Sequence, residues 1–180
     1  MPGSMSKRAQ PVLHVDELTL RPWALRDVPA LVTAYADPAI QHWHTRSMTA
    51  AEAEDWVQAA NRSWTTETAA NWAVTERGAV LGRMAVRSVD LAEGLAGIGY
   101  WVVPAARGHA VAPRSLVAVT AWALDELGLH RLELEHSTAN EASCRVAQKA
   151  DYLLESTKRS QALHRDGWHD VHLHTHLNHD

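Results

Sequence analysis

The stretch WVVPAARGHAVAPRSLVAVTAWALDELG, Trp101 to Gly128, carries the chain from a strand through a short loop into a long helix. Four apolar or aromatic residues come first, followed by a proline, a loop with Arg107 and Gly108, and an amphipathic run. The first N–H groups of a helix have no intrahelical acceptor and attract anions. The stretch therefore predicts a strand–loop–helix unit whose loop can bind a phosphate group.

The bulk composition limits the class of protein. A chain of 180 residues is long enough for one domain with a substantial core. It has no run of 18 apolar residues, so we expect no membrane association. The net charge of −4 argues against nucleic acid as the main partner. The single cysteine, Cys144, rules out an internal disulfide and favours a reducing cytoplasm.

The chain divides into two parts at the sequence level. Residues 1–11 lack the apolar segment of a secretory signal, and we predict a flexible N-terminal segment there. The residues MPGS before Met5 have the look of a vector remnant. Residues 12–180 contain no repeat and no Pro/Gly/Ser-rich linker, so we predict that they form one domain.

Hydrophobic periodicity predicts the order β-α-α-β-β-β-α-β-α-β-β, which is a mixed α/β chain. A capping box, Thr49-x-x-Glu52, opens the second helix, and Asp27 is the expected cap of the first. The expected strands are 12–23, 70–77, 79–91, 95–103 and 130–137, with two more across 152–177. The expected helices are 25–38, 47–64, 112–128 and 140–150.

Several motifs in this order resemble the GNAT acetyltransferases, in particular the RimJ/RimL-like branch, which includes N-terminal protein acetyltransferases. The matching segments are LTLRPWALRDVPAL (18–31), IGYWVVPAARGHAVA (98–112), LGLHRLELEHSTANEASCRVAQKADY (127–152) and GWHDVHLH (167–174). The resemblance implies an α/β GNAT fold over 12–180, with a mixed, mostly antiparallel sheet of about seven strands flanked by helices. It also implies that the fourth and fifth strands splay apart.

The resemblance implies acetyl-CoA as the acetyl donor. The acetyl-CoA signature of the family is Gln/Arg-x-x-Gly-x-Gly/Ala, and Ala110 stands here in place of its central glycine. Alanine also supplies an N–H group, and we predict that Ala110 adopts helical φ and ψ, so that the loop still binds a pyrophosphate. The implied cofactor-binding set is Trp101, Val102, Val103, Arg107, Gly108, His109, Ala110, Val111, Ala112, Asn140 and Ser143.

The resemblance also suggests the catalytic residues. Ser143 is the predicted acid for the departing thiolate, although it can equally be the N3 residue of a helix capped by Asn140. RimL-like relatives often carry a glutamate just before IGYW, where this chain has Gly97. Glu135 and His136 on the fifth strand are substitutes by position, whereas a strand-edge glutamate is more often solvated or ion-paired. The missing carboxylate favours a weakly basic amine as acceptor.

Three further groups of residues have two interpretations each. His42, Trp43 and His44 fall where the family shapes its acceptor pocket, or they form an ordinary helix–helix cluster. The alternating histidines at 172, 174 and 176 share one strand face, but we assign no metal site because no cysteine or carboxylate has metal-ligand spacing near them. Cys144 is interpreted as a small core residue rather than as a nucleophile.

The predicted function is acetyl-CoA-dependent N-acetyl transfer to a primary amine by direct attack on the thioester. The acceptor is a protein or peptide N-terminus, or an amine-bearing small molecule such as an antibiotic. The alternative is a non-catalytic acyl-CoA-binding module that acts as a sensor or partner, and thiol release that depends on an amine separates the two. The partners expected are acetyl-CoA and the amine, with a homodimer left open.

Overall fold

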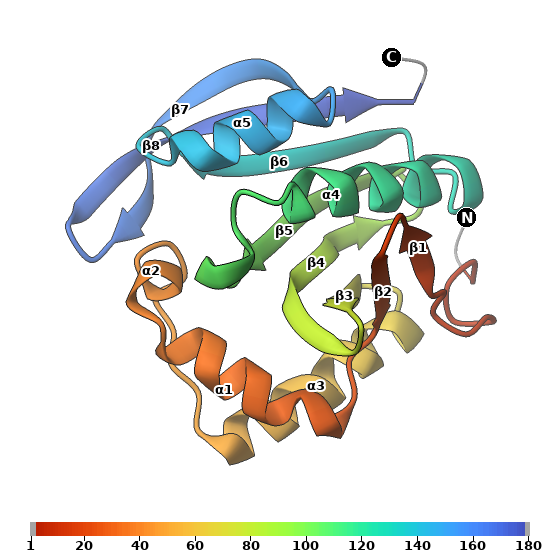
Figure 1. Cartoon of the computed structure of the whole chain (residues 1–180). Helices are drawn as coiled ribbons and strands as arrows, with labels where there is room; N and C mark the ends of the chain where they lie inside the picture. The colour runs from red at the N-terminus through yellow and green to blue at the C-terminus, as the bar shows by residue number, and fades with distance from the viewer. Residues whose placement is uncertain (1–2, 179–180) are drawn as a thin grey trace.

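The computed structural model describes residues 3–178, which form one open sheet with helices on both faces (Figure 1). The strands are β1 (Leu13–Val15), β2 (Leu18–Pro22), β3 (Ala69–Glu76), β4 (Ala79–Asp90), β5 (Leu95–Val102), β6 (Arg131–Ser137), β7 (Leu153–His164) and β8 (Gly167–Leu177). The helices are α1 (Val28–Ala36), α2 (Pro38–Gln41), α3 (Ala50–Thr65), α4 (Val111–Ala121) and α5 (Glu141–Lys149).

The sheet is mixed and mostly antiparallel, as predicted. Its strand order is β1-β2-β3-β4-β5-β6-β8-β7, and only β5 and β6 run parallel. Across residues 3–178 it has eight strands rather than about seven, because the segment expected as one strand over 12–23 is a tight hairpin. Asp16 sits in the turn with a φ of 50°, a left-handed conformation that aspartate tolerates better than most residues.

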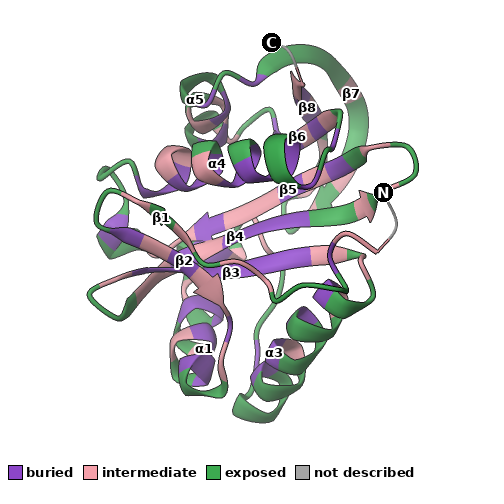
Figure 2. Ribbon diagram, turned by 90° about the vertical axis from the view of Figure 1, so that its right-hand side faces the viewer, coloured by how far each residue is buried: buried purple, intermediate pink, exposed green. Residues whose placement is uncertain are grey.

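Helices cover the two faces of the sheet in pairs (Figure 2). On one face, α4 and α5 close a cluster that includes Trp72, Leu116 and Leu134. On the other face, α1 and α3 close a smaller cluster around Trp23 and Trp101. Because successive residues of a strand point to opposite faces, every strand that runs between the two layers contributes side chains to both.

The helix ends follow local signals in the sequence. The predicted capping box of α3 is present, since the Thr49 hydroxyl accepts from the N–H of Glu52, whose carboxylate accepts from the N–H of Thr49. Asp27 differs from expectation. Its carboxylate forms an ion pair with Arg21 and accepts from the N–H of Ala24, and so caps the 3₁₀ turn before α1 rather than α1 itself.

Residues 3–11, predicted as a flexible segment, pack instead against α3 and β3. Met5 is fully buried in the main cluster. The indole N–H of Trp64 donates to the carbonyl of Arg8 at 2.7 Å, and that of Trp72 donates to the carbonyl of Pro11 at 2.8 Å. The sequence held no sign of this packing, because it depends on two indoles from distant parts of the chain.

The carboxylate of Glu67 holds this segment by its main chain. It accepts hydrogen bonds from the N–H groups of Ser6, Gly3 and Met5, which lower the pKa of Glu67 to about 2. A carboxyl whose pKa is lower in the folded state stabilises the fold above its ordinary pKa of 4.5. That stabilisation is lost as the pH falls from about 5 towards 2.

We therefore expect Glu67→Gln to lower the melting temperature at pH 7. We also expect the variant to lose less stability than the wild type between pH 5 and pH 2.5, because its amide does not titrate. Thermal melts across this pH range measure both effects. The control is Glu54→Gln on the exposed side of α3. Parallel curves for wild type and Glu67→Gln would contradict the prediction.

Candidate active site

A cleft opens where β5 parts from β6. The two strands pair only from Leu95 to Ile98 and from Arg131 to Leu134. Beyond that point, residues 99–102 and 135–137 line a cleft of about 830 Å³. The predicted splay between these strands is therefore confirmed.

One end of the cleft suits an anion. The helix α4 begins there, and the N–H groups of Val111 and Ala112 have no intrahelical acceptor. Arg107 lines this end together with Arg145 and Lys149 of α5. Unpaired N–H groups and cationic side chains are the donors that a pyrophosphate requires, so these residues fit the phosphates of acetyl-CoA.

The cofactor set predicted from sequence is only partly gathered at this cleft. Residues of the set that line it are Trp101, Val102, Arg107, Gly108, Ala110, Val111, Ala112, Asn140 and Ser143. Val103 and His109 are not among the lining residues. The predicted set did not include Arg145 and Lys149. These residues are four apart within 141–149, so a helical wheel places them on one face.

The conformation predicted for Ala110 is wrong. The residue immediately precedes α4 with φ 54° and ψ 24°, which is the left-handed region and not the helical one. A left-handed alanine costs about 1–2 kcal/mol, because its Cβ crowds the following carbonyl oxygen. The chain has to reverse direction here between the 3₁₀ turn Pro104–Ala106 and α4, and the glycine of the family motif would do so without that strain.

The edge of β5 beyond Ile98 has no partner strand, although the carbonyl of Val102 accepts from Nε of Arg107 at 3.2 Å and His44 bonds to the main chain of Tyr100. Residues 99–102 pair with β4 on one side and have no partner strand on the side of β6. An amide-bearing arm such as pantetheine can add there like a short strand. Trp101 contributes only its main chain, since its buried indole N–H points to the opposite layer and donates to the Tyr35 hydroxyl at 3.2 Å.

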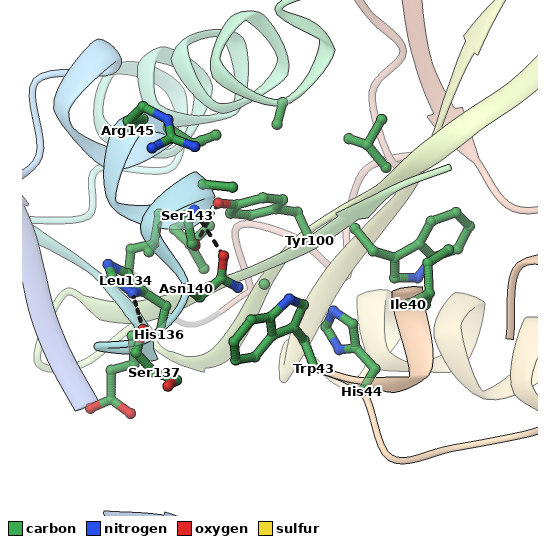
Figure 3. A pocket seen from close by; sticks show the side chains of 18 of the residues that line it. Ile40, Trp43, His44, Tyr100, Leu134, His136, Ser137, Asn140, Ser143 and Arg145 are labelled. Atoms are coloured by element: carbon green, nitrogen blue, oxygen red, sulfur yellow. Dashed lines mark hydrogen bonds between the residues drawn. The ribbon is translucent and has the colours of Figure 1, made fainter. Parts of the chain in front are cut away.

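A pair of hydroxyl groups marks the centre of the cleft (Figure 3). The oxygens of Tyr100 and Ser143 are 2.7 Å apart, and burial raises the pKa of Tyr100 to about 12. Asn140 caps α5, and its side chain accepts from the main-chain N–H of Ser143 at 3.1 Å. The cap thus uses the main chain of Ser143, so its hydroxyl group is not needed for the cap.

Tyr100 was not in the predicted site. Strand alternation puts residues 98, 100 and 102 on the face of α4 and α5, and this signal was available from sequence. The short distance between Tyr100 and Ser143 could not be predicted from sequence, because it depends on how α5 lies across the parted strands.

The opposite wall of the cleft comes from α2, the turn that follows it and the β7–β8 hairpin. Trp43 and His44 line the cleft and face Asn140 and Ser143 across it (Figure 3). His42 does not line the cleft, and its ring packs against Trp43 at 4.3 Å between centroids.

The ring centroids of Trp43 and His164 are 5.6 Å apart, so Trp43 also contacts the β7–β8 hairpin. Burial, and next the positive charge of Arg83, lower the pKa of His44, which is therefore uncharged at neutral pH.

Two arginines of β4, Arg83 and Arg87, also line the cleft. Arg83 donates to the side-chain oxygen of Asn71 at 2.7 and 3.1 Å, and burial lowers its pKa. Arg87 lies across Gly97 and Gly99, where an added Cβ would meet its side chain at 3.4 Å. Within residues 3–178, neither guanidinium forms an ion pair. The wall is therefore positively charged where the RimL-like pattern would have a carboxylate.

The residues predicted as substitute bases are engaged elsewhere. Glu135 lines the cleft but forms an ion pair with Lys158. His136 is buried, its Nδ1 lies 2.7 Å from the Ser137 carbonyl, and burial lowers its pKa.

A different polar chain reaches the cleft. The hydroxyl of Ser137, which lines the cleft, is 2.7 Å from Nδ1 of His169, and Nε2 of His169 is 3.1 Å from the carboxylate of Asp166. An ionised carboxylate only accepts, so Nε2 carries the proton and Nδ1 is free to accept from Ser137. The chain can move a proton away from the cleft.

Comparison with solved structures gives the same fold. RimL, an α-N-protein acetyltransferase of a ribosomal protein, in complex with coenzyme A, has a TM-score of 0.87 at 20% identity, covering 94% of this chain and 100% of that one. RimJ of Mycobacterium smegmatis with CoA-disulfide has a TM-score of 0.83 at 20% identity, covering 93% and 86%.

An acetyl transferase of Salmonella typhimurium that modifies the N-terminal serine of a ribosomal subunit protein has a TM-score of 0.82 at 20% identity, covering 93% and 99%. No curated protein sequence matches the chain.

The parted parallel strands with a helix start beside them belong to the fold that this chain shares with these acetyltransferases. The family model for the acetyltransferase (GNAT) domain matches residues 17–152, and the chain belongs to this family. The protein is accordingly an acetyltransferase, and acetyl-CoA is its acetyl donor. Within the described residues, no helix combines the length and the apolar character needed to cross a membrane.

The left-handed alanine makes a specific prediction. Ala110→Gly should raise the free energy of unfolding by up to about 1 kcal/mol, because the relieved strain exceeds the entropy that glycine adds to the unfolded chain. Denaturant unfolding measures this. In the matched control, Ala118→Gly inside α4, the sign reverses and stability falls by about 1 kcal/mol. Equal destabilisation by both changes would show that Ala110 is not strained.

Proposed function

We propose that the protein acetylates the α-amino group of a peptide or protein N-terminus, or of a small molecule, that carries negative charge close to the amine. The observation that supports this most directly is the pair Arg83 and Arg87 on the acceptor wall, with no ion-pair partner in the described part of the chain. Arg83 is partly buried and Arg87 is exposed, and two neighbouring cations without an ion-pair partner in residues 3–178 favour an acceptor with a carboxylate or phosphate near its amine.

The same arginines reduce the need for a general base. Freeing the lone pair of an α-amine, with a pKa near 7.7–8.0, costs only about 1 kcal/mol at pH 7, against roughly 4.6 kcal/mol for a lysine. A cationic neighbour lowers the pKa of an ammonium group further, because it disfavours the charged form. An α-amine is therefore a better acceptor here than a lysine side chain, although Gly97 replaces the carboxylate of the RimL-like pattern.

The proton that the amine loses during the reaction leaves through the polar chain of Ser137, His169 and Asp166. We infer that the amine, on attacking the thioester, passes its proton to the Ser137 hydroxyl, which passes its own to Nδ1 of His169. Asp166 stabilises the imidazolium that forms, as a carboxylate beside a histidine does in other acyl transfers. Glu135 and His136 have no part in this route.

Tyr100 and Ser143 assist the leaving group by donating hydrogen bonds. With the pKa of Tyr100 near 12 and that of a thiol near 8.5, complete proton transfer to the thiolate is uphill by roughly 5 kcal/mol. The pair therefore stabilises the developing negative charge on sulfur, and the proton itself is taken up from solvent. This assigns Ser143 a role as donor rather than as the acid that the sequence suggests.

RimL and the Salmonella enzyme are named for acetylating ribosomal-protein N-termini, which supports the RimJ/RimL-like branch and an N-terminal acceptor for this chain. A cytoplasmic location and a homodimer stay predictions.

The acceptor is tested with peptides that begin with serine and continue with acidic, neutral or basic residues. Thiol release from acetyl-CoA should be fastest with the acidic series. Arg87→Gln should raise the KM of acidic peptides about tenfold or more, the loss of one charge-assisted contact, and leave basic peptides unaffected. The control is Arg159→Gln on the exposed face of β7. Tight CoA binding with no turnover on any amine would instead support the non-catalytic module.

The donor pair is tested by Ser143→Ala and Tyr100→Phe. Each change should lower kcat by about 10- to 100-fold with little change in acetyl-CoA affinity, because the hydrogen bond to sulfur strengthens only as charge develops. Stability should fall little in Ser143→Ala, whereas Asn140→Ala removes the cap and should cost about 1 kcal/mol. Full turnover in Ser143→Ala would remove this residue from the mechanism.

A further inference from the structure

Four potential metal ligands meet beneath α5, in a place that the acetyl-transfer chemistry does not use. They are His136 of β6, His172 and His174 of β8, and Cys144 of α5, and their ligand atoms all lie within 4.8 Å of one another. The pairing of the strands explains the cluster. His136 stands opposite His172 in the β6–β8 register, and His174 opposite Leu134 is its diagonal neighbour on the same face.

The ring nitrogens at this cluster are buried and unsatisfied. His174 is fully buried and His136 is 8% exposed. Nε2 of His136, Nδ1 of His172 and Nε2 of His174 have no hydrogen-bond partner within residues 3–178. Buried polar atoms in folded proteins almost always have a partner, so three such nitrogens at one point indicate a ligand.

The tautomers follow from the other ring nitrogens. Nδ1 of His136 lies 2.7 Å from the carbonyl oxygen of Ser137, and Nδ1 of His174 lies 3.2 Å from that of Tyr152. A carbonyl oxygen only accepts, so each Nδ1 carries the proton and each Nε2 presents a lone pair. Metal-binding histidines are held in the same way, by donation from the second nitrogen to a carbonyl or carboxylate.

The ring nitrogens and the Cys144 sulfur converge on one point of the cluster. The rings of His136 and His174 are stacked, with centroids 5.1 Å apart and planes 24° from parallel. His176, the next residue on the same strand face, has a different environment, since its Nδ1 lies 3.1 Å from the Asp151 carbonyl and its ring packs on Tyr152. The cluster is therefore specific to three histidines and the thiol.

We propose that His136, Cys144, His172 and His174 bind one Zn²⁺ ion in a tetrahedral site. Three imidazoles and a thiolate suit Zn²⁺, whereas Mg²⁺ and Ca²⁺ prefer oxygen ligands. Bonds of about 2.0–2.3 Å place tetrahedral ligands roughly 3.3–3.8 Å apart, so the side chains need to close by about 1 Å. On binding, the thiol of Cys144 releases its proton to solvent.

Four protein ligands leave no open position, so the site is structural. The metal would tie the first turn of α5 to β6 and β8. Cys144 follows Ser143, whose hydroxyl meets Tyr100 in the cleft. Zn²⁺ therefore both stabilises the fold and holds the hydroxyl pair in position. The proposal differs from the sequence expectation of no metal site, because α5 brings the one cysteine of the chain to the histidines.

The test uses the full chain without an affinity tag of histidines, stripped with a chelator and titrated with Co²⁺ as the probe. We expect one Co²⁺ per chain, with the strong visible absorption of tetrahedral cobalt and a thiolate-to-cobalt charge-transfer band. Zn²⁺ should displace the cobalt, raise the melting temperature and protect Cys144 from a thiol reagent. Failure of acetyl transfer would leave these readouts unaffected.

Two ligand variants and one control complete the test. Cys144→Ala should abolish the charge-transfer band and weaken Zn²⁺ binding at least about 100-fold, since even the loss of a residue that supports a ligand costs 10- to 100-fold. His172→Asn should weaken binding similarly, and far-UV circular dichroism of the metal-free variants checks their fold. His176→Gln should bind as the wild type does. Absence of stoichiometric binding, or unchanged binding in Cys144→Ala, would overturn the proposal.

Discussion

The parting of β5 from β6 after the Ile98–Leu134 pair is the constraint on which the rest of the site depends. Two parallel strands that stayed paired would satisfy each other's main-chain groups and leave no room between the layers. Once they diverge, residues 99–102 of β5 have one edge without a partner strand. Strand alternation then sends Tyr100 towards α5 and Trp101 towards α1 and α3.

This alternation gives the two sides of the cleft different chemistry. The side of α4 and α5 has a helix start, cations and the hydroxyl pair of Tyr100 and Ser143. The side of α2 and the β7–β8 hairpin has aromatic rings and the two arginines of β4. Under the proposed function, the phosphate-rich donor would bind from the first side and the amine from the second, and the two would meet at the edge of β5.

The features that the sequence predicts well are set by near neighbours in the chain or are implied by the family resemblance. The capping box at Thr49, the loop before α4 and the splayed strands all follow from local pattern or from family motifs. The errors arise where distant segments meet. The burial of Met5 depends on two tryptophans, and the contact of Tyr100 with α5 depends on the packing of a helix over the sheet.

The left-handed Ala110 is an error of another kind. An alanine in place of a glycine favours an ordinary conformation locally, but the tertiary path of the loop overrides that preference. The histidine face of β8 was seen in the sequence, whereas its cysteine partner lies on a separate element and becomes a neighbour only through the fold.

The contact of Arg87 with Gly97 and Gly99 has an evolutionary consequence. Because neither glycine has a Cβ, the side chain of Arg87 packs closely over both positions, and a change at one of the three affects the others. A glutamate introduced at position 97 would find a guanidinium already beside it and would be neutralised as an ion pair. A lineage that acquires a carboxylate at position 97 therefore also has to change Arg87 before that carboxylate is free to accept a proton.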